Sequence, residues 1–184
     1  MLTNYQREKL INTVLYFAAN TKYCGKTKLF KLLYFLDFEH YKKTGRSVTG
    51  LDYYAWQMGP VPVALCDEME CPEKDMAECV AFNAKSIGRG RFYLQVEAKT
   101  KFDPAHFTKR ELGLMERLAN EYRTARADDL IEATHIDTLP WHQVFNVEGR
   151  KRKQIPYDYS LRKDEKEIME FIKKENDEVL NNYK

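Results

Sequence analysis

Apolar residues recur at intervals of three and four along two stretches near the start of the chain, and this spacing predicts two helices. A capping box formed by Thr3 and Gln6 precedes the first stretch. Its apolar positions are Leu10, Ile11, Val14, Leu15 and Ala18. We expect Thr27 to cap the second helix, which should end at Thr44 with Gly45 in the left-handed conformation. Because leucine and aromatic residues cover most of its circumference, we expect the second helix to be central and packed on several sides.

Later segments predict one β-hairpin and further helices. Apolar residues alternate along two arms at 80–82 and 92–96, and the segment between them contains two glycines. Thr108 and Glu111 form a second capping box, and Pro140 suits the first turn of a short helix. The predicted fold class is therefore mainly α with a small antiparallel β-hairpin, in a single compact helical domain.

Composition supports one globular domain. The 184 residues are 43% hydrophobic and 32% charged, which is typical of a folded chain. We expect a domain at residues 1–148, with a basic loop and a C-terminal helix at 149–184 packed on it. The polar N-terminus and the lack of an apolar run of about 18 residues argue against a signal peptide and a membrane span. We therefore expect a cytoplasmic protein whose four cysteines are reduced.

Charge is unevenly distributed although the net charge is only +2. The stretch from Lys22 to Arg46 holds seven basic and two acidic residues, and the stretch from Ala64 to Glu78 holds six acidic and one basic. A dipolar surface of this kind favours a charged protein partner or self-association. It argues against a dedicated nucleic-acid binder, which usually carries a basic excess overall.

The sequence offers weak candidates for catalytic or metal chemistry. Cys66, Cys71 and Cys79 form a metal-like cluster, but the first spacing is wider than structural zinc sites use and a fourth ligand is needed. Cys24 precedes a glycine before a helix start, yet no local motif marks it as a nucleophile. The chain contains no Walker, GxGxxG, GxSxG or HExxH motif. We therefore expect no enzyme activity, no cofactor and no bound metal.

We interpret two polar features in the later part of the chain, the basic segment 150–153 and His135, as structural. Arg150 to Lys153 are four consecutive basic residues that could grip phosphates. Because no aromatic residues interleave with them, we interpret this segment as a solvated loop. His135 ends a predicted helix, where a protonated ring suits the helix dipole or a neutral ring can bond a carbonyl. A structural role is favoured for His135 over a catalytic one.

The segment LDYYAW, which begins at Leu51, combines alternating side chains with the rigid dipeptide Gly59-Pro60. Alternation places Tyr54 and Trp56 on one side, opposite a side that can face the core. The dipeptide should fix the angle between this segment and an acidic helix beginning at Val61. Rigid aromatic side chains suit a recognition surface. The alternative is that both sides are buried.

The stretch KTKLFKLLYFLDFEHYKKTGRSVTGLDYYAWQMGPVPVAL resembles the Panacea domain, the SocA-like antitoxin family of toxin–antitoxin systems, which also occurs in phage and mobile-element proteins. The resemblance runs from about Thr3 to Phe145. The matching residues are Lys28, Leu29, Lys31, Leu32, Leu33, Tyr34, Gly45, Trp56, Gly59, Pro60 and Val61, followed by Thr134, His135, Pro140 and Trp141.

The resemblance implies an antitoxin that neutralises a cognate toxin, encoded by the adjacent gene, through direct protein contact. It implies no catalytic residue and no cofactor. In this interpretation Tyr54 and Trp56 are anchors of the toxin-binding surface. Asp67 and Glu68, on the acidic helix, form a negative rim that faces a basic toxin.

The alternative function is a winged-helix-like DNA-binding regulator, because a helical core with one hairpin also suits that architecture. Its phosphate contacts would come from Lys28, Lys31, Lys42, Lys43 and the basic residues 150–153.

Overall fold

A computed structural model describes residues 5–86, 88, 90, 92–136, 139–162, 164–168 and 170. The chain is mainly helical, with two small antiparallel sheets, so the predicted fold class is confirmed. The elements in chain order are α1 Gln6–Asn20, α2 Lys26–Thr44, β1 Tyr54–Trp56, β2 Gly59–Val61, α3 Val63–Glu68, α4 Lys74–Cys79, β3 Val80–Ser86, β4 Phe92–Ala98, α5 Lys109–Glu121, α6 Ala127–Thr134, α7 Pro140–His142, the π-helix η1 Gln143–Val147 and the 3₁₀-helix η2 Tyr157–Ser160.

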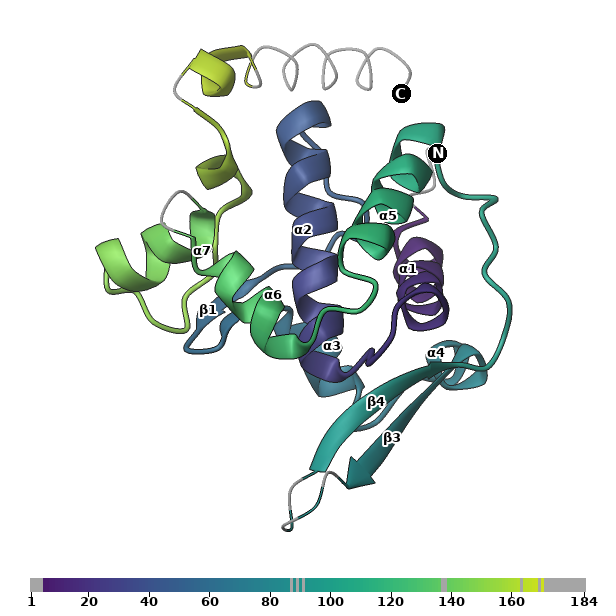
Figure 1. The fold of residues 1–184 in the computed structure, drawn as a ribbon. Coiled ribbons are helices and arrows are strands. Elements are labelled where there is room, and N and C mark those ends of the chain that lie inside the picture. Colours follow the sequence, from purple (N-terminus) through teal and green to yellow (C-terminus); the bar gives the residue numbers. More distant parts are fainter. Residues whose placement is uncertain are drawn as a thin grey trace.

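Helix α2 is the centre of the fold, as the sequence predicts. It lies between α1 and α5 on one side and α6 and hairpin β1–β2 on the other, and the β3–β4 hairpin projects beyond its N-terminal end (Figure 1). Every residue from Lys28 to Phe38 is buried. A helix packed on all sides cannot show a single apolar stripe, which explains why its apolar positions cover most of the circumference.

The prediction for the C-terminal end of α2 is confirmed, and the prediction for its N-terminal end is wrong. Gly45 has φ 71° and ends the helix in the left-handed conformation, as expected. The helix begins at Lys26, before Thr27, because Gly25 has extended backbone angles and takes the N-cap position. Thr27 therefore lies in the first turn. For α1, the residue at the N-cap is Tyr5, and the expected cap Thr3 lies outside the described residues.

The short sheet β1–β2 corrects the expected course of the chain at Gly59-Pro60. These residues form strand β2 together with Val61. Strand β2 pairs antiparallel with β1, so that Val61 lies opposite Tyr54 and Gly59 opposite Trp56. The helix expected at Val61 begins instead at Val63, after Pro62. Proline lacks an N–H, so Pro60 fits a short edge strand, and its carbonyl is used elsewhere in the fold.

Several of the remaining elements follow the sequence closely, although α4 and η2 were not predicted. Strands β3 and β4 pair from Val80 with Ala98 to Ser86 with Phe92, which confirms the predicted hairpin. Thr108 caps α5 in a complete capping box, and Pro140 is the first residue of α7. Helical backbone is described at 164–168, and most of the expected C-terminal helix lies outside the described residues.

None of the helices within the described residues is both long and apolar enough to cross a membrane.

Candidate functional site

Hairpin β1–β2 presents one buried face and one partly exposed face. Tyr53 and Ala55 are fully buried, whereas Tyr54 and Trp56 on the alternate positions are half-buried. The expected alternation is confirmed. Met58, in the turn between the strands, is 57% exposed. Sequence reasoning missed Met58, and its place directly before the chain reversal expected at Gly59-Pro60 was the available indication of an exposed apolar residue.

Lys31 of α2 braces the hairpin from the core side. Its side chain is almost completely buried, and Nζ donates a hydrogen bond to the carbonyl of Pro60 at 2.9 Å. Gly59 has φ 93°, and a β-carbon there would lie 2.8 Å from Lys31 Nζ and 2.8 Å from Thr134 Oγ1. Both the conformation and the close approach require glycine. The Gly-Pro motif is therefore the place where the hairpin fits against the buried lysine.

Helices α6 and α7 brace the hairpin from a second direction. The indole Nε1 of Trp141 donates to the carbonyl of Trp56 at 2.9 Å. His135 stacks on Trp141 with ring centroids 3.8 Å apart, and Phe145 stacks on Trp141 at 4.7 Å. This position agrees with the structural role favoured for His135. The family-motif residues Lys31, His135 and Trp141 thus converge on the hairpin that contains Gly59 and Pro60, although the three come from distant parts of the sequence.

The basic loop 150–153 is the third support of the hairpin. Ala55 N–H donates to the carbonyl of Lys153 at 2.9 Å, and Arg152 N–H donates to the carbonyl of Ala55 at 2.8 Å. The guanidinium of Arg152 lies 5.3 Å from the ring centre of Trp56. Lys151 lies 5.4 Å from the ring of Phe145. The loop is exposed, as expected, but aromatic partners from outside the loop contact it, so the sequence interpretation of an isolated solvated loop was incomplete.

Burial shifts the pKa values of two residues behind the hairpin, Lys31 and His135. Burial lowers the pKa of Lys31 from its ordinary value to about 7. The pKa of His135 is also lowered, first by burial and then by the charges of Lys31 and His142. A lysine whose pKa is lowered to about 7 can be buried in its neutral form with a single carbonyl acceptor, at a far lower desolvation cost than a fixed charge.

This gives a prediction for the pH dependence of stability. Lys31 loses its proton at about pH 7 when folded but near 10.5 when unfolded, so the unfolded state binds the extra proton between these values. The free energy of unfolding of the wild type should therefore rise with pH relative to Lys31→Met, by at most about 4 kcal/mol between pH 7 and 10. Urea unfolding of both proteins from pH 6 to 10 measures the difference. A constant difference would show that Lys31 keeps an ordinary pKa.

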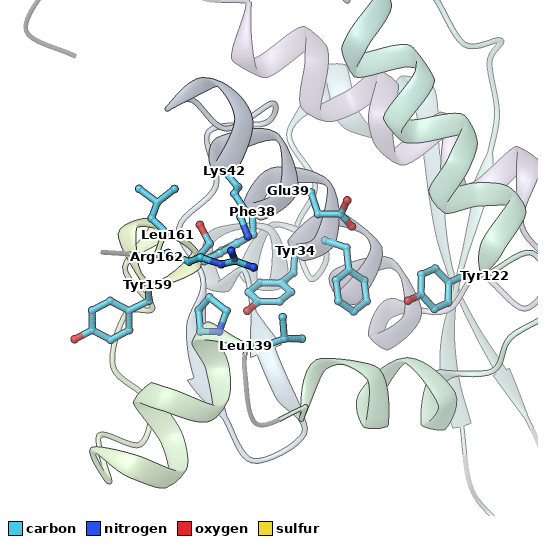
Figure 2. A pocket seen from close by; sticks show the side chains of 12 residues that line it. Tyr34, Phe38, Glu39, Lys42, Tyr122, Leu139, Tyr159, Leu161 and Arg162 are labelled. Carbon is cyan, nitrogen blue, oxygen red and sulfur yellow. The ribbon is translucent and has the colours of Figure 1, made fainter. Parts of the chain in front are cut away.

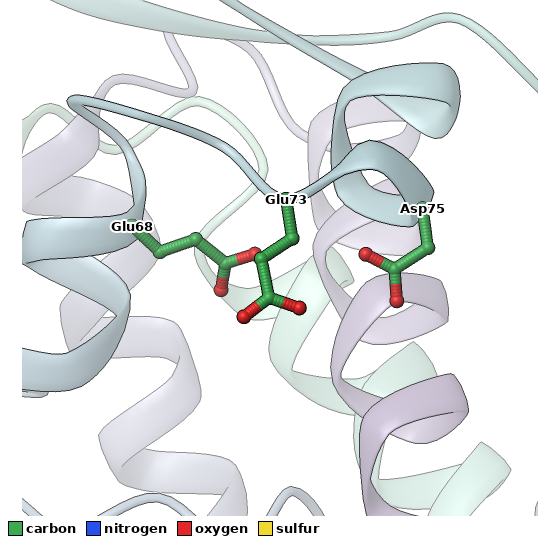
Figure 3. Close-up of side chains that lie close together, drawn as sticks. All are labelled: Glu68, Glu73 and Asp75. Carbon is green, nitrogen blue, oxygen red and sulfur yellow. The ribbon is translucent and has the colours of Figure 1, made fainter.

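The acidic residues are placed differently from the two aromatic anchors. Asp67 is exposed, but the side chain of Glu68 is only 13% exposed and forms an ion pair with Arg7 of α1. Arg7 also pairs with Asp75 at 2.6 Å and lowers the pKa of that carboxyl to about 2. Figure 3 shows Glu68 and Asp75 with Glu73 between α3 and α4. The acidic helix is thus tied to α1, while the basic loop pairs with β1.

Glu68 and Asp67 should consequently respond differently to charge reversal. Glu68→Lys places a cation beside Arg7 and should lower the free energy of unfolding by about 1–3 kcal/mol. Asp67→Lys should change it by less than about 0.5 kcal/mol, because that side chain is exposed. Chemical denaturation of the two variants tests this. Equal effects would mean that the Arg7–Glu68 pair does not stabilise the fold.

Two further charged residues of α2, Lys28 and Asp37, are buried and form hydrogen bonds inside the fold. Nζ of Lys28 donates to the carbonyls of Lys22, Tyr122 and Ala125 at 2.7–2.8 Å. Asp37 accepts hydrogen bonds from the backbone N–H groups of Val48 and Thr49, in the segment that leads to β1. Sequence reasoning counted Lys28 and Lys31 among the phosphate contacts of a DNA-binding alternative. That assignment was wrong for both, because each is buried and donates to backbone carbonyls.

The thiols do not gather into a metal or nucleophile site within the described residues. Cys66, Cys71 and Cys79 are not among the groups whose ligand atoms lie within 4.8 Å of one another. Cys24 is buried, and burial raises the pKa of its thiol to about 11. A thiol with a raised pKa is a poor nucleophile at neutral pH.

A separate groove of about 640 Å³ lies between α2, α7 and η2 (Figure 2). Tyr34, Phe38 and Leu139 line its floor. Glu39 at its rim pairs with Arg117, and Lys42 lies 3.8 Å from Glu165. The family-motif residue Tyr34 is buried against this groove rather than against the hairpin's exposed face.

The SocA-like antitoxin Panacea domain matches residues 29–142. Because this match spans more than half of the chain, the protein belongs to the SocA-like antitoxin family that carries the Panacea domain. The resemblance inferred from the motifs is thereby confirmed. The matched region runs from α2 to α7 and contains the bracing residues on those helices, whereas the basic loop 150–153 lies beyond it. No curated protein and no solved structure matches the chain.

Proposed function

We propose that this protein is an antitoxin that neutralises a cognate toxin by binding it directly, with hairpin β1–β2 and loop 150–153 as the contact surface, and that it performs no catalysis. The observation that carries the proposal is the bracing of the hairpin. Its backbone is held by Lys31, Trp141 and the basic loop, while Trp56 and Met58 remain partly or largely exposed. A recognition surface that is already ordered loses little conformational entropy on binding.

The charge around the hairpin indicates what the toxin presents there. Arg152 lies over the ring of Trp56, and Lys151 and Lys153 are exposed beside it. Tryptophan and arginine are the residues most enriched at binding hot spots. We therefore expect an acidic toxin face with an apolar pocket. This differs from the basic toxin face expected from Asp67 and Glu68, because Arg7 already neutralises part of the acidic helix.

The test is co-expression with the product of the adjacent gene, which we propose encodes the toxin, in the cytoplasm of a bacterial host. The neighbouring product should stop growth when expressed alone, and this protein should restore growth and co-purify with it. A neighbour that is harmless, or a rescue without co-purification, would contradict direct neutralisation.

The DNA-binding alternative predicts a different outcome in the same preparation. A regulator would shift its operator DNA with an affinity that falls steeply as salt rises. An antitoxin held by apolar anchors should keep its toxin over the same salt range. Loss of the protein complex with salt, together with a salt-sensitive DNA shift, would favour the regulator.

A further inference from the structure

A second cleft, of about 640 Å³, lies on elements that the proposed toxin surface does not use. It is bounded by the first half of β4, by the loop and first turn of α2, and by the start of α6, on the side where the β3–β4 hairpin projects (Figure 1). The lining residues are Tyr23, Gly25, Lys26, Thr27, Lys28, Phe92, Tyr93, Leu94, Arg126, Ala127 and Asp128.

The edge of β4 that faces this cleft is only half covered. Val96 N–H donates to the carbonyl of Cys24 at 2.8 Å, and Gly25 forms a bridge with Gln95. Backbone groups of alternate residues in a strand point to the same edge, so the N–H of Leu94 and both backbone groups of Phe92 share the edge used by Val96. The chain leaves this edge at Lys26, where α2 begins. The segment Cys24–Gly25 therefore pairs with β4 at Gln95 and Val96, and this pairing does not continue to Phe92, which lines the cleft.

Two aromatic side chains stand exposed at this unfinished edge. Phe92 is 65% exposed and Tyr23 is 58% exposed. Tyr23 also has φ 56°, a backbone conformation that bulky residues rarely adopt. Natural sheets usually protect such edges with charges, proline or covering segments. An aromatic residue held in a strained conformation beside an open edge is consistent with a surface that a partner covers.

The charge of the cleft indicates the chemistry of that partner. Two of the lining side chains, Lys26 and Arg126, offer positive charge to the cleft, and Asp128 is the acidic one. Arg126 lies 5.5 Å from the ring centre of Tyr23. Lys28 fixes the floor, because it holds the carbonyls of two loops together. No acidic residue occupies the first turn of α2, so the positive end of its dipole adds to the field.

We propose that an extended, acidic segment of a partner polypeptide binds this cleft by adding a strand to β4 at Phe92–Leu94. Its backbone continues the pairing that Cys24 and Gly25 begin, its apolar side chains contact Tyr23 and Phe92, and its carboxylates approach Lys26 and Arg126. Strand addition of this kind draws affinity from backbone hydrogen bonds and specificity from side-chain contacts. The inference is independent of toxin neutralisation through the β1–β2 hairpin.

The probe is a short synthetic peptide of alternating glutamate and valine, titrated into the ¹⁵N-labelled full-length protein. The backbone amide signals of Phe92, Leu94 and Tyr23 should shift, and a lysine–valine peptide should leave them unchanged. Arg126→Glu should weaken binding about tenfold or more. Arg110→Glu, an exposed charge reversal on α5, should bind like the wild type, and the melting temperatures of both variants show whether they are folded.

A glutamate–valine peptide that is N-methylated at every residue tests strand addition on the unaltered protein. Methylation must cover every backbone N–H, because methylation of alternate residues leaves one edge of the peptide free to pair. The fully methylated peptide keeps its charge but cannot donate to β4, so binding should be lost. Equal binding of the methylated peptide would overturn strand addition. An absence of shifts at the cleft would overturn the site. Shifts there with a single-stranded oligonucleotide, but not with the acidic peptide, would overturn the assignment to a polypeptide.

Discussion

Asp37→Ala should lower the free energy of unfolding by about 3–5 kcal/mol, because it leaves several buried donors without an acceptor. Asp37 is fully buried in α2 and accepts hydrogen bonds from the backbone of Val48 and Thr49 at 2.8 Å and from the hydroxyl of Tyr53 at 2.7 Å. The Thr49 hydroxyl also donates to it. Burial raises the pKa of Asp37, and these donors oppose that shift. Urea unfolding monitored by circular dichroism measures the loss.

The matched control is Glu39→Ala, two residues further along the same helix. Glu39 is partly exposed and pairs with Arg117 on the surface, so this change should cost no more than about 1 kcal/mol. Asp37→Asn keeps one acceptor oxygen and should lie between the two variants. If Asp37→Ala and Glu39→Ala are equally stable, the segment leading to β1 is not held by Asp37.

Trp56→Ala should weaken binding of the toxin by about thirtyfold or more, which corresponds to about 2 kcal/mol for one aromatic anchor. The side chain supplies both apolar contact area and the ring over which Arg152 lies. Tyr54→Ala should also weaken binding, and with less effect on the fold, because Trp56 packs partly against the core. Isothermal titration with the toxin gives the affinities, and thermal unfolding of the same samples gives their stabilities.

The control for the loss of an exposed aromatic residue is Tyr5→Ala. Tyr5 is 44% exposed and stacks on His106, away from the hairpin, so its removal should leave toxin affinity unchanged. Met58→Ala probes the same surface with little cost to the core, since Met58 lies in the turn. If Tyr54, Trp56 and Met58 variants all keep wild-type affinity, or lose it only in step with melting temperature, the toxin binds elsewhere.

The structure changes the expected role of the acidic residues in this surface. The sequence placed Asp67 and Glu68 beside the aromatic segment because a turn and a short helix follow it in the chain. In the fold, α3 is tied to α1 through Arg7, and β1 pairs with β2 on one edge and with loop 150–153 on the other. A role for Asp67 and Glu68 in toxin binding stays a prediction.

Local sequence was sufficient for several elements of the fold. Periodicity located α1, α2 and the β3–β4 hairpin, and Gly45 marked the end of α2 because only a left-handed residue closes a helix there. Alternation in the aromatic segment correctly separated its buried face from its exposed face. These features depend on residues that lie within a few positions of one another, so a linear pattern contains them.

Only the tertiary structure decided what the charged and special residues do. Lys28, Lys31 and Asp37 look like surface charges on a helix, but their hydrogen-bond partners lie in loops and strands elsewhere in the chain. Gly59 is required because Lys31 and Thr134 approach it, which no pattern around Gly59 reveals. A buried charge is acceptable only when distant segments supply its partners. Those partners are brought together by packing, and the sequence records no sign of them beyond the residue types themselves.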